Sequence, residues 1–305
     1  MSALAEPQRI TFSANGISVA ALSWGSDSQD APLALCLHGY PDTAWTWRFL
    51  GPHLAANGWR VVAPFLRGYA PTELAPDNCY QVGALVRDIV DTHAALGGDE
   101  RAVLIGHDWG GVAAYPTAAH SPELFRRVVT LAVPPLPVVF DPLTSPVRLA
   151  RNFPLVARQL RNSWYTIFQQ LPGISERSLG WLIPKLWRDW SPGYDGREDV
   201  ARVFEALPDR KHRTAALRYY RALAQPWYRR SAYAAEQAHL FGIPICPTLF
   251  LNGRNDGCLQ SAYAERSVGV LPEGSEVEII ENAGHFLQLE QPEVVNERIS
   301  RFLAA

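Results

Sequence analysis

The segment IGHDWGGVAAY, residues 105–115, most constrains the fold of this chain. An apolar run over residues 102–105 precedes it, and a helix-like pattern follows it. Gly106 and Gly110 stand two residues either side of Asp108. This spacing is typical of the sharp strand-to-helix turn that presents a nucleophile, usually a serine. An ordinary helix N-cap is the alternative role for Asp108, but the flanking glycines and the preceding strand fit the turn better.

Strand-like and helix-like segments alternate along the first 135 residues. Two alternating runs meet at Asn15-Gly16, which indicates a β-hairpin. The next strand-like runs are PLALCLHG, WRVVAPFLRG, RAVLIGHD and RRVVTLAVPP, with helical spacing in VGALVRDIVDTHAAL and after Asp108. Continuous apolar runs are typical of strands buried on both faces. The pattern predicts an α/β fold whose mostly parallel central sheet has helices on both faces.

The alternation stops near residue 135 and resumes near residue 241. Residues 136–240 contain helix-like segments and no convincing strand, whereas IPICPTLFLNG and SEVEIIENAGH are again strand-like. An insertion of about 100 residues has the size of a subdomain. We therefore predict a core formed by residues 1–135 and 241–305, interrupted by an all-helical cap over residues 136–240.

Composition limits the partners and cofactors that we expect. Of the 305 residues 48% are hydrophobic, and the formal net charge is −2 without a lysine- or arginine-rich block, so we expect no nucleic-acid partner. The N-terminus does not resemble a signal peptide, and no apolar run is long enough to span a bilayer, so we expect no membrane association. The four cysteines form no CxxC pair, which argues against a metal site and fits a reducing cytoplasm.

An aspartate at the nucleophile position indicates attack on a saturated carbon. A carboxylate is ionised at neutral pH, needs no base to activate it, and forms an alkyl ester with an electrophilic sp³ carbon. Cleaving that ester requires an activated water, for which His285 in NAGHF is the candidate base. Asp256 in LNGRNDGCL is the candidate carboxylate that orients the histidine. The chain order Asp108, Asp256, His285 matches the nucleophile–acid–histidine order of α/β-hydrolases.

Hydrolysis of the ester also requires N–H donors for the developing oxyanion. We expect one from the backbone of Trp109, beside the nucleophile, and one from the backbone of Tyr40 in CLHGYPDTAWTWR. Pro41 has a fixed φ and would hold this loop rigid.

Five short motifs in order make the chain resemble the α/β-hydrolase fold epoxide hydrolases, which are related to the haloalkane dehalogenases. These motifs are HGYPD, RGYAPT, GHDWGG, NGRND and NAGHF, and together they cover nearly the whole chain. The resemblance implies hydrolysis of a small apolar epoxide to a vicinal diol through a covalent aspartyl ester, with water as the second substrate and no cofactor or metal. It leaves a monomer and a homodimer equally open. The motif RGYAPT departs from the family, which commonly has a glycine where Ala70 stands.

The resemblance also implies two cap tyrosines that hold and protonate the epoxide oxygen. NSWYTIFQQLPG matches the segment of the first and gives Tyr165, and LRYYRAL matches the second and gives Tyr220, with Tyr219 as the substitute. A phenol with a pKa near 10 stays protonated and can donate to an alkoxide-like oxygen. We expect the substrate to contact His38, Pro41, Trp164 and Phe168 as well.

Two other functions fit parts of the sequence. A haloalkane dehalogenase would use N–H donors to hold the leaving halide, and Trp109 with one of the cap tryptophans, Trp164, Trp181, Trp187 or Trp190, could supply them. The position of Tyr40 lacks the side-chain N–H that many dehalogenases have there. A non-catalytic ligand receptor on the same scaffold is the third possibility, and the complete Asp108–Asp256–His285 set argues against it.

Overall fold

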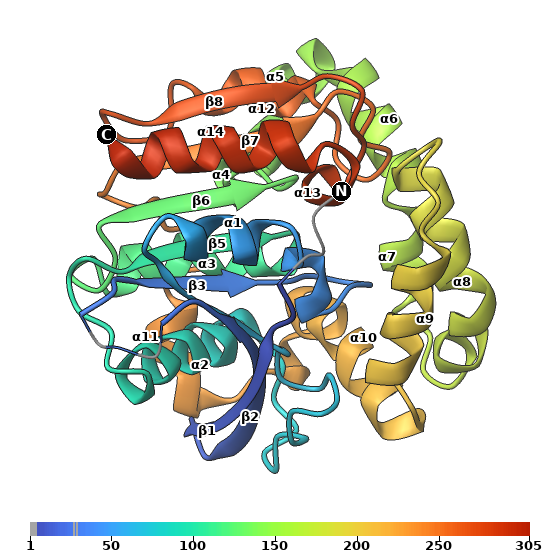
Figure 1. The fold of residues 1–305 in the computed structure, drawn as a ribbon. Coiled ribbons are helices and arrows are strands. Elements are labelled where there is room, and N and C mark those ends of the chain that lie inside the picture. Colours follow the sequence, from blue (N-terminus) through green and yellow to red (C-terminus); the bar gives the residue numbers. More distant parts are fainter. Residues whose placement is uncertain (1–4, 27, 29) are drawn as a thin grey trace.

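The computed structural model describes residues 5–26, 28 and 30–305 and is built around one eight-stranded sheet (Figure 1). The strand order is β1-β2-β4-β3-β5-β6-β7-β8. The strands are β1 Gln8–Ala14, β2 Ile17–Trp24, β3 Leu33–Leu37, β4 Arg60–Pro64, β5 Val103–His107, β6 Arg127–Leu131, β7 Thr248–Gly253 and β8 Glu276–Ile280. β1 pairs with β2, and β2 with β4, antiparallel, and every other pair is parallel. The predicted α/β fold with a mostly parallel sheet is confirmed.

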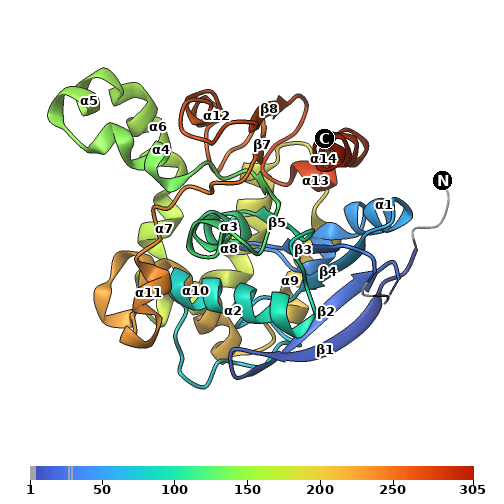
Figure 2. The same ribbon diagram turned by 90° about the vertical axis from the view of Figure 1, so that its left-hand side faces the viewer.

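Helices cover both faces of the sheet, which explains why its central strands are apolar throughout (Figure 2). α1 (Leu50–Ala56) packs with α14 (Pro292–Ala304) on one face. α2 (Val82–Ala95) and α3 (Trp109–His120) pack together on the other, where α11 (Ala234–Gln237) joins them. α12 (Ala262–Ser267) packs against β7 and β8, and α13 (Leu287–Glu290) leads into α14. The sequence pattern predicted α2 and α3 but no helix at α1.

Between β6 and β7 every residue is described, and the chain forms helices and turns without a strand. We call residues 132–247 the helical insertion. Besides α11 its helices are α4 Leu136–Phe140, α5 Pro146–Arg151, α6 Phe153–Asn162, α7 Trp164–Phe168, α8 Ile174–Trp190, α9 Arg197–Ala206 and α10 Arg210–Ala224. Figure 1 shows α7 to α10 beyond the end of the sheet toward which the arrows of β3, β5 and β6 point. The insertion therefore lies over the carboxyl ends of parallel strands, where ligands of α/β sheets bind.

A buried polar network joins the helices of the insertion. Arg221 of α10, 2% exposed, donates to Glu176 of α8 at 2.8 Å, to the Ser175 hydroxyl at 2.8 Å and to the Gln169 carbonyl at 2.9 Å. Burial raises the pKa of Glu176, but the hydrogen bond and charge of Arg221 outweigh it and lower the pKa to about 2. A buried charge is tolerated when its donors are satisfied in this way. The network holds α10, which carries Tyr220, against α8.

No helix among the described residues has both the length and the apolar character needed to cross a membrane.

Candidate active site

Asp108 lies at the sharp turn between β5 and α3. Its φ of 50° and ψ of −116° are an unusual conformation for a residue with a side chain. The flanking glycines are required by close backbone contacts: a Cβ on Gly106 would lie 2.4 Å from the Gly110 carbonyl oxygen, and a Cβ on Gly110 would lie 2.3 Å from the Leu37 carbonyl oxygen. Such a turn lifts the side chain of Asp108 above the carboxyl end of the sheet.

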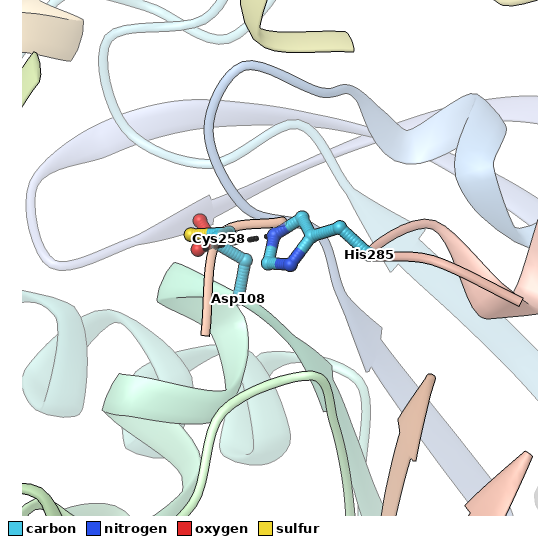
Figure 3. Close-up of side chains that lie close together, drawn as sticks. All are labelled: Asp108, Cys258 and His285. Carbon is cyan, nitrogen blue, oxygen red and sulfur yellow. Dashed lines mark ion pairs between the residues drawn. The ribbon is translucent and has the colours of Figure 1, made fainter. Parts of the chain in front are cut away.

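The two carboxylate oxygens of Asp108 have different neighbours. Oδ1 accepts a hydrogen bond of 2.8 Å from the Tyr40 N–H, and Oδ2 lies 3.5 Å from Nε2 of His285 (Figure 3). The backbone approaches this closely because residue 39 is glycine, whose added Cβ would lie 2.4 Å from Oδ1. Burial raises the pKa of Asp108, but the adjacent His285 outweighs it and lowers the pKa below its usual value. Asp108 is therefore ionised at neutral pH.

His285 follows β8 and lies between two carboxylates. Its Nδ1 donates to Oδ2 of Asp256 at 3.0 Å, and the side chains of both residues are fully buried. Burial lowers the pKa of the imidazole, but the charges of Asp256 and Asp108 outweigh it and raise the pKa of His285 to about 10. His285 is therefore an imidazolium at neutral pH, next to the ionised carboxylate of Asp108.

This protonated histidine predicts a pH dependence of stability. The pKa of about 10 in the folded chain exceeds the ordinary 6.5, so the charge contributes stability that is complete below pH 6.5 and is lost as the pH rises through 10. We expect the unfolding free energy of the wild type, minus that of His285→Gln, to fall from about pH 7 to about pH 9. Urea unfolding at several pH values measures it. A difference that is constant across this range would show that His285 does not titrate as described.

Asp256, which follows β7, positions a loop of the backbone as well as the side chain of His285. While Oδ2 accepts from His285, Oδ1 accepts from the backbone N–H groups of Cys258 at 2.6 Å and Leu259 at 3.0 Å. Both oxygens of the buried carboxylate thus accept hydrogen bonds, which fixes both the imidazole and the start of the β7–α12 loop.

The end of α8 contacts the loops that carry Asp256 and His285, which together with Asp108 we call the triad. The carbonyl of Trp190 accepts from the backbone N–H of His285 at 3.0 Å and from that of Gly257 at 3.2 Å. Both loops need glycine here, because a Cβ on Gly257 would lie 2.1 Å from the Asp189 carbonyl oxygen and a Cβ on Gly284 would lie 2.5 Å from the Trp190 carbonyl oxygen. The helical insertion therefore takes part in positioning Asp256 and His285.

A cavity of about 510 Å³ opens above Asp108, between the sheet and the insertion. Trp109, Tyr165, Tyr220 and Cys258 line it together with Asp108. The remaining lining is mainly apolar and comes from several elements, with Leu136, Val139 and Phe140 of α4 and Val156 and Leu160 of α6 among it. An apolar cavity with a few polar groups is typical of a small-molecule site.

Tyr165 and Tyr220, both from the helical insertion, line this cavity. The Tyr165 hydroxyl lies 3.4 Å from Sγ of Cys258, and the buried Tyr220 hydroxyl has no hydrogen-bond partner among the described residues. The rings of Tyr165 and Tyr220 meet edge to face, with centroids 5.7 Å apart. Burial raises the pKa of both phenols well above its usual value, so both remain proton donors.

Tyr219, the substitute for Tyr220, has a structural role instead. Its hydroxyl donates to the Arg67 carbonyl at 2.8 Å, and its ring packs edge to face against Tyr69. Neighbouring residues of a helix point about 100° apart, so only one of the two tyrosines can face the cavity.

The four residues expected to contact the substrate do not line this cavity. Trp164 and Phe168 share one face of α7, where their rings pack at 6.1 Å, and Trp164 lines a different, polar pocket. His38 is fully buried, and its Nε2 accepts from the Leu66 N–H at 3.0 Å. The Pro41 carbonyl accepts from the indole N–H of Trp187 at 2.8 Å. His38 and Pro41 thus support the loop that carries the Tyr40 N–H and do not reach the cavity.

The sequence reasoning missed the aliphatic lining from α4 and α6, and it missed Cys258. The amphipathic spacing of Val156, Gln159, Leu160 and Ser163 could have indicated the lining, because all four lie on the cavity side of α6 and its end. Cys258 had a weaker signal, its place two residues after Asp256. Its thiol, the Asp108 carboxylate and Nε2 of His285 are the potential metal ligands of this site (Figure 3).

Comparison with known proteins identifies the family of the chain. Residues 32–292 match the family model of the alpha/beta hydrolase fold. The chain is 30% identical to the AB hydrolase superfamily protein YfhM of Bacillus subtilis, over 95% of each chain. It is 31% identical to Epoxide hydrolase 4 of Homo sapiens, over 89% of this chain and 72% of that protein. The crystal structure of an epoxide hydrolase from Vigna radiata superposes with a TM-score of 0.74 at 26% identity, over 98% of each chain. The chain therefore belongs to the α/β-hydrolase fold family and, within it, to the epoxide hydrolases.

Proposed function

We propose that this enzyme hydrolyses small apolar epoxides to vicinal diols through a covalent ester on Asp108, with the helical insertion as its cap. One observation carries the proposal: the ionised Asp108 and the hydroxyls of Tyr165 and Tyr220 line the same apolar cavity. The site thus combines a nucleophile for a ring carbon with two proton donors for the ring oxygen.

In the first half-reaction Oδ2 of Asp108 attacks a ring carbon. The carbon–oxygen bond of the epoxide breaks, and a tyrosine hydroxyl gives its proton to the leaving oxygen. Oδ1 becomes the ester carbonyl oxygen and stays in the hydrogen bond from the Tyr40 N–H. The tyrosinate then regains a proton, and this proton is supplied overall by the imidazolium of His285.

The loss of this proton follows from the change in charge. Ester formation removes the negative charge of Asp108, one of the two carboxylates that keep the pKa of His285 high. The neutral imidazole then accepts a proton from water, and the hydroxide attacks the ester carbon. The oxyanion forms on Oδ1, beside the Tyr40 N–H and the first amide of α3 at Trp109, which has no acceptor within its helix. Collapse breaks the bond between the ester carbon and the substrate-bound oxygen. That oxygen takes the proton left on the new carboxyl group, so the diol leaves with Asp108 ionised and His285 again an imidazolium.

The positions of the tryptophans favour epoxides over haloalkanes. Within the described part of the chain, the residues lining the cavity do not include Trp164, Trp181, Trp187 or Trp190. Trp187 already donates its indole N–H to the Pro41 carbonyl. Of the halide donors considered, only Trp109 reaches the cavity, so the proton donors suited to an oxygen leaving group outnumber those suited to a halide.

A substrate panel tests the proposal. The purified enzyme is incubated with aryl and alkyl epoxides and with haloalkanes of matched size, and diol and halide are quantified. We expect diol formation from epoxides and no halide release above background. Halide release with no diol would replace the proposal with a dehalogenase, and turnover of neither class would leave a non-catalytic receptor.

Removing the hydroxyl of Tyr220 should slow ring opening. Tyr220→Phe keeps the ring, and the lost hydrogen bond to a charged oxygen is worth about 1.5–3 kcal/mol. We expect a roughly ten- to hundredfold fall in the alkylation rate, with a similar effect for Tyr165→Phe and a far larger one for the double variant. Single-turnover quench-flow measures these rates. Tyr219→Phe is the matched control, because its hydroxyl donates to the Arg67 carbonyl outside the cavity. Near-parental ring opening by the double variant would remove both tyrosines from the mechanism.

A further inference from the structure

Cys258 places a sulfur atom where the proposed reaction has no use for one. Its thiol, a carboxylate oxygen of Asp108 and Nε2 of His285 all lie within 4.8 Å of one another, and all three residues are buried (Figure 3). Nε2 of His285 is a buried atom with no hydrogen-bond partner among the described residues. Three different donor atoms therefore lie close together, beside the cavity that Asp108 and Cys258 line.

The donor set matches the preferences of zinc. Zn²⁺ is bound by cysteine sulfur, histidine nitrogen and carboxylate oxygen, and sites with three protein ligands keep a fourth position open for water. Magnesium and calcium instead prefer oxygen ligands and do not favour a thiol.

The surrounding hydrogen bonds support the same conclusion. Asp256 accepts from Nδ1 of His285, which leaves Nε2 as the nitrogen that faces the cluster, and such a carboxylate–histidine pair is common behind zinc ligands. The same carboxylate accepts from the Cys258 N–H at 2.6 Å. One buried residue thus positions two of the three donors.

Access also allows a cation to bind. Binding leaves the net charge of the site unchanged, because a divalent ion replaces one proton of His285 and one of Cys258 beside the two buried carboxylates. The cavity that contains Asp108 and Cys258 is also lined by Leu160 and Ile167, which are 63% and 69% exposed. The cavity therefore reaches the surface, and an ion has a path to the three donors.

We propose that Asp108, Cys258 and His285 form a site for a thiophilic divalent cation, with Zn²⁺ as the best fit. Binding displaces the thiol proton of Cys258 and the Nε2 proton of His285 into solvent, and no electron is transferred. The bound ion occupies the nucleophile and the base at once. Zn²⁺ is therefore a reversible inhibitor that competes with the substrate, and this inhibitory consequence alone rests on the proposed function.

Metal binding can be measured without any substrate. Co²⁺ serves as a spectroscopic probe, because thiolate coordination gives a near-ultraviolet charge-transfer band. We expect this band in the wild type and its loss in Cys258→Ala. Cys246→Ser is the matched control, because Cys246 is the one cysteine that is not fully buried and lies outside the cavity. A band that survives in Cys258→Ala or disappears in Cys246→Ser would overturn the proposal. Circular dichroism verifies that each variant is folded.

Isothermal titration with Zn²⁺ then gives the affinity. Replacing even an outer-shell residue of a zinc site costs about 10- to 100-fold, so removing the Cys258 ligand should weaken binding by at least about tenfold. Cys258→Ser, which keeps a weaker oxygen donor, should fall between the wild type and Cys258→Ala. Equal affinity in all three proteins would exclude Cys258 as a ligand.

Epoxide turnover with and without Zn²⁺ tests the inhibitory role. For each variant the readout is the ratio of the two rates, so a change of basal rate does not affect it. We expect Zn²⁺ to raise the apparent KM of the wild type, Mg²⁺ at equal concentration to have no effect, and Cys258→Ala to need at least about tenfold more Zn²⁺. Equal inhibition of the wild type and Cys258→Ala would overturn the role. If no epoxide is turned over, the proposed function fails while the Co²⁺ band still decides whether the metal site exists.

Discussion

Asp108→Ala should lose essentially all epoxide turnover and keep its fold. The substitution removes the attacking oxygen, and loss of a nucleophile typically costs on the order of 10⁴-fold or more in kcat. The chain should still fold, because the deleted carboxylate contacts the Tyr40 N–H and His285 and contributes no apolar packing. A φ of 50° costs about 1–3 kcal/mol for aspartate and alanine alike, so the substitution adds little backbone strain.

Asp195→Ala is the control for this variant, because it removes an exposed carboxylate of the insertion that pairs only with Arg197. Its turnover should equal that of the wild type. Diol formation by a folded Asp108→Ala protein above a few hundredths of the parental rate would rule out Asp108 as the nucleophile. Alanine is preferable to asparagine here, because asparagine can deamidate back to aspartate.

His285→Gln should separate the two half-reactions. Asp108 attacks without a base, so the ester should form, whereas its hydrolysis loses the group that activates water and should slow by about 10²- to 10⁴-fold. Intact-protein mass spectrometry after incubation with an epoxide should show one substrate mass added to the chain. In a quenched assay, the diol should not exceed one equivalent of the enzyme over the time in which the wild type completes many turnovers.

The double variant Asp108→Ala/His285→Gln provides the control, because it should gain no mass under the same conditions. An adduct on the double variant would place the modification on another residue. An unmodified His285→Gln chain after long incubation with a substrate that the wild type converts would contradict an ester intermediate.

The sheet could be predicted because its signals are local. The Asn15-Gly16 turn marks the β1–β2 hairpin, and the apolar run before Gly106 marks β5, since burial on both faces requires such runs. α1 was not recognised because Gly51 and Pro52 stand in its first turn, where proline is in fact well tolerated. Its packing against α14, far along the chain, is not visible from the local sequence.

The candidate site could be predicted only as far as its motifs extend. Asp108, Asp256 and His285 each follow a strand, so the carboxyl ends of a parallel sheet bring them together. The direction of a cap side chain depends instead on a rotation of about 100° per residue, which separates Tyr220 from Tyr219 and Tyr165 from Trp164. The exact first residue of a helix cannot be read from the sequence, so the sequence does not fix which of two neighbouring side chains faces the cavity.

Contacts made by main-chain atoms were beyond prediction for another reason. The triad loops are held by the backbone carbonyl of Trp190. Every residue type has such a carbonyl, so no sequence motif predicts this contact. The same is true of the two amides of the β7–α12 loop that bind Asp256. Such contacts depend on how separate elements pack, and only the folded chain reveals them.

The shared Trp190 carbonyl has a consequence for how this enzyme can be re-engineered. The end of α8 is joined to the two loops that carry Asp256 and His285, so the whole insertion is not an exchangeable module: a graft from a relative must reproduce that carbonyl and its two glycine neighbours to keep the triad assembled. α4 supplies cavity walls from Leu136, Val139 and Phe140, and α6 supplies Val156 and Leu160. Gln159 of α6, however, donates to the Cys258 carbonyl at 2.8 Å, in the loop that follows Asp256. Libraries that reshape the substrate range therefore belong in α4 and at Val156 and Leu160, with Gln159 and α8 left as fixed parts of the catalytic scaffold.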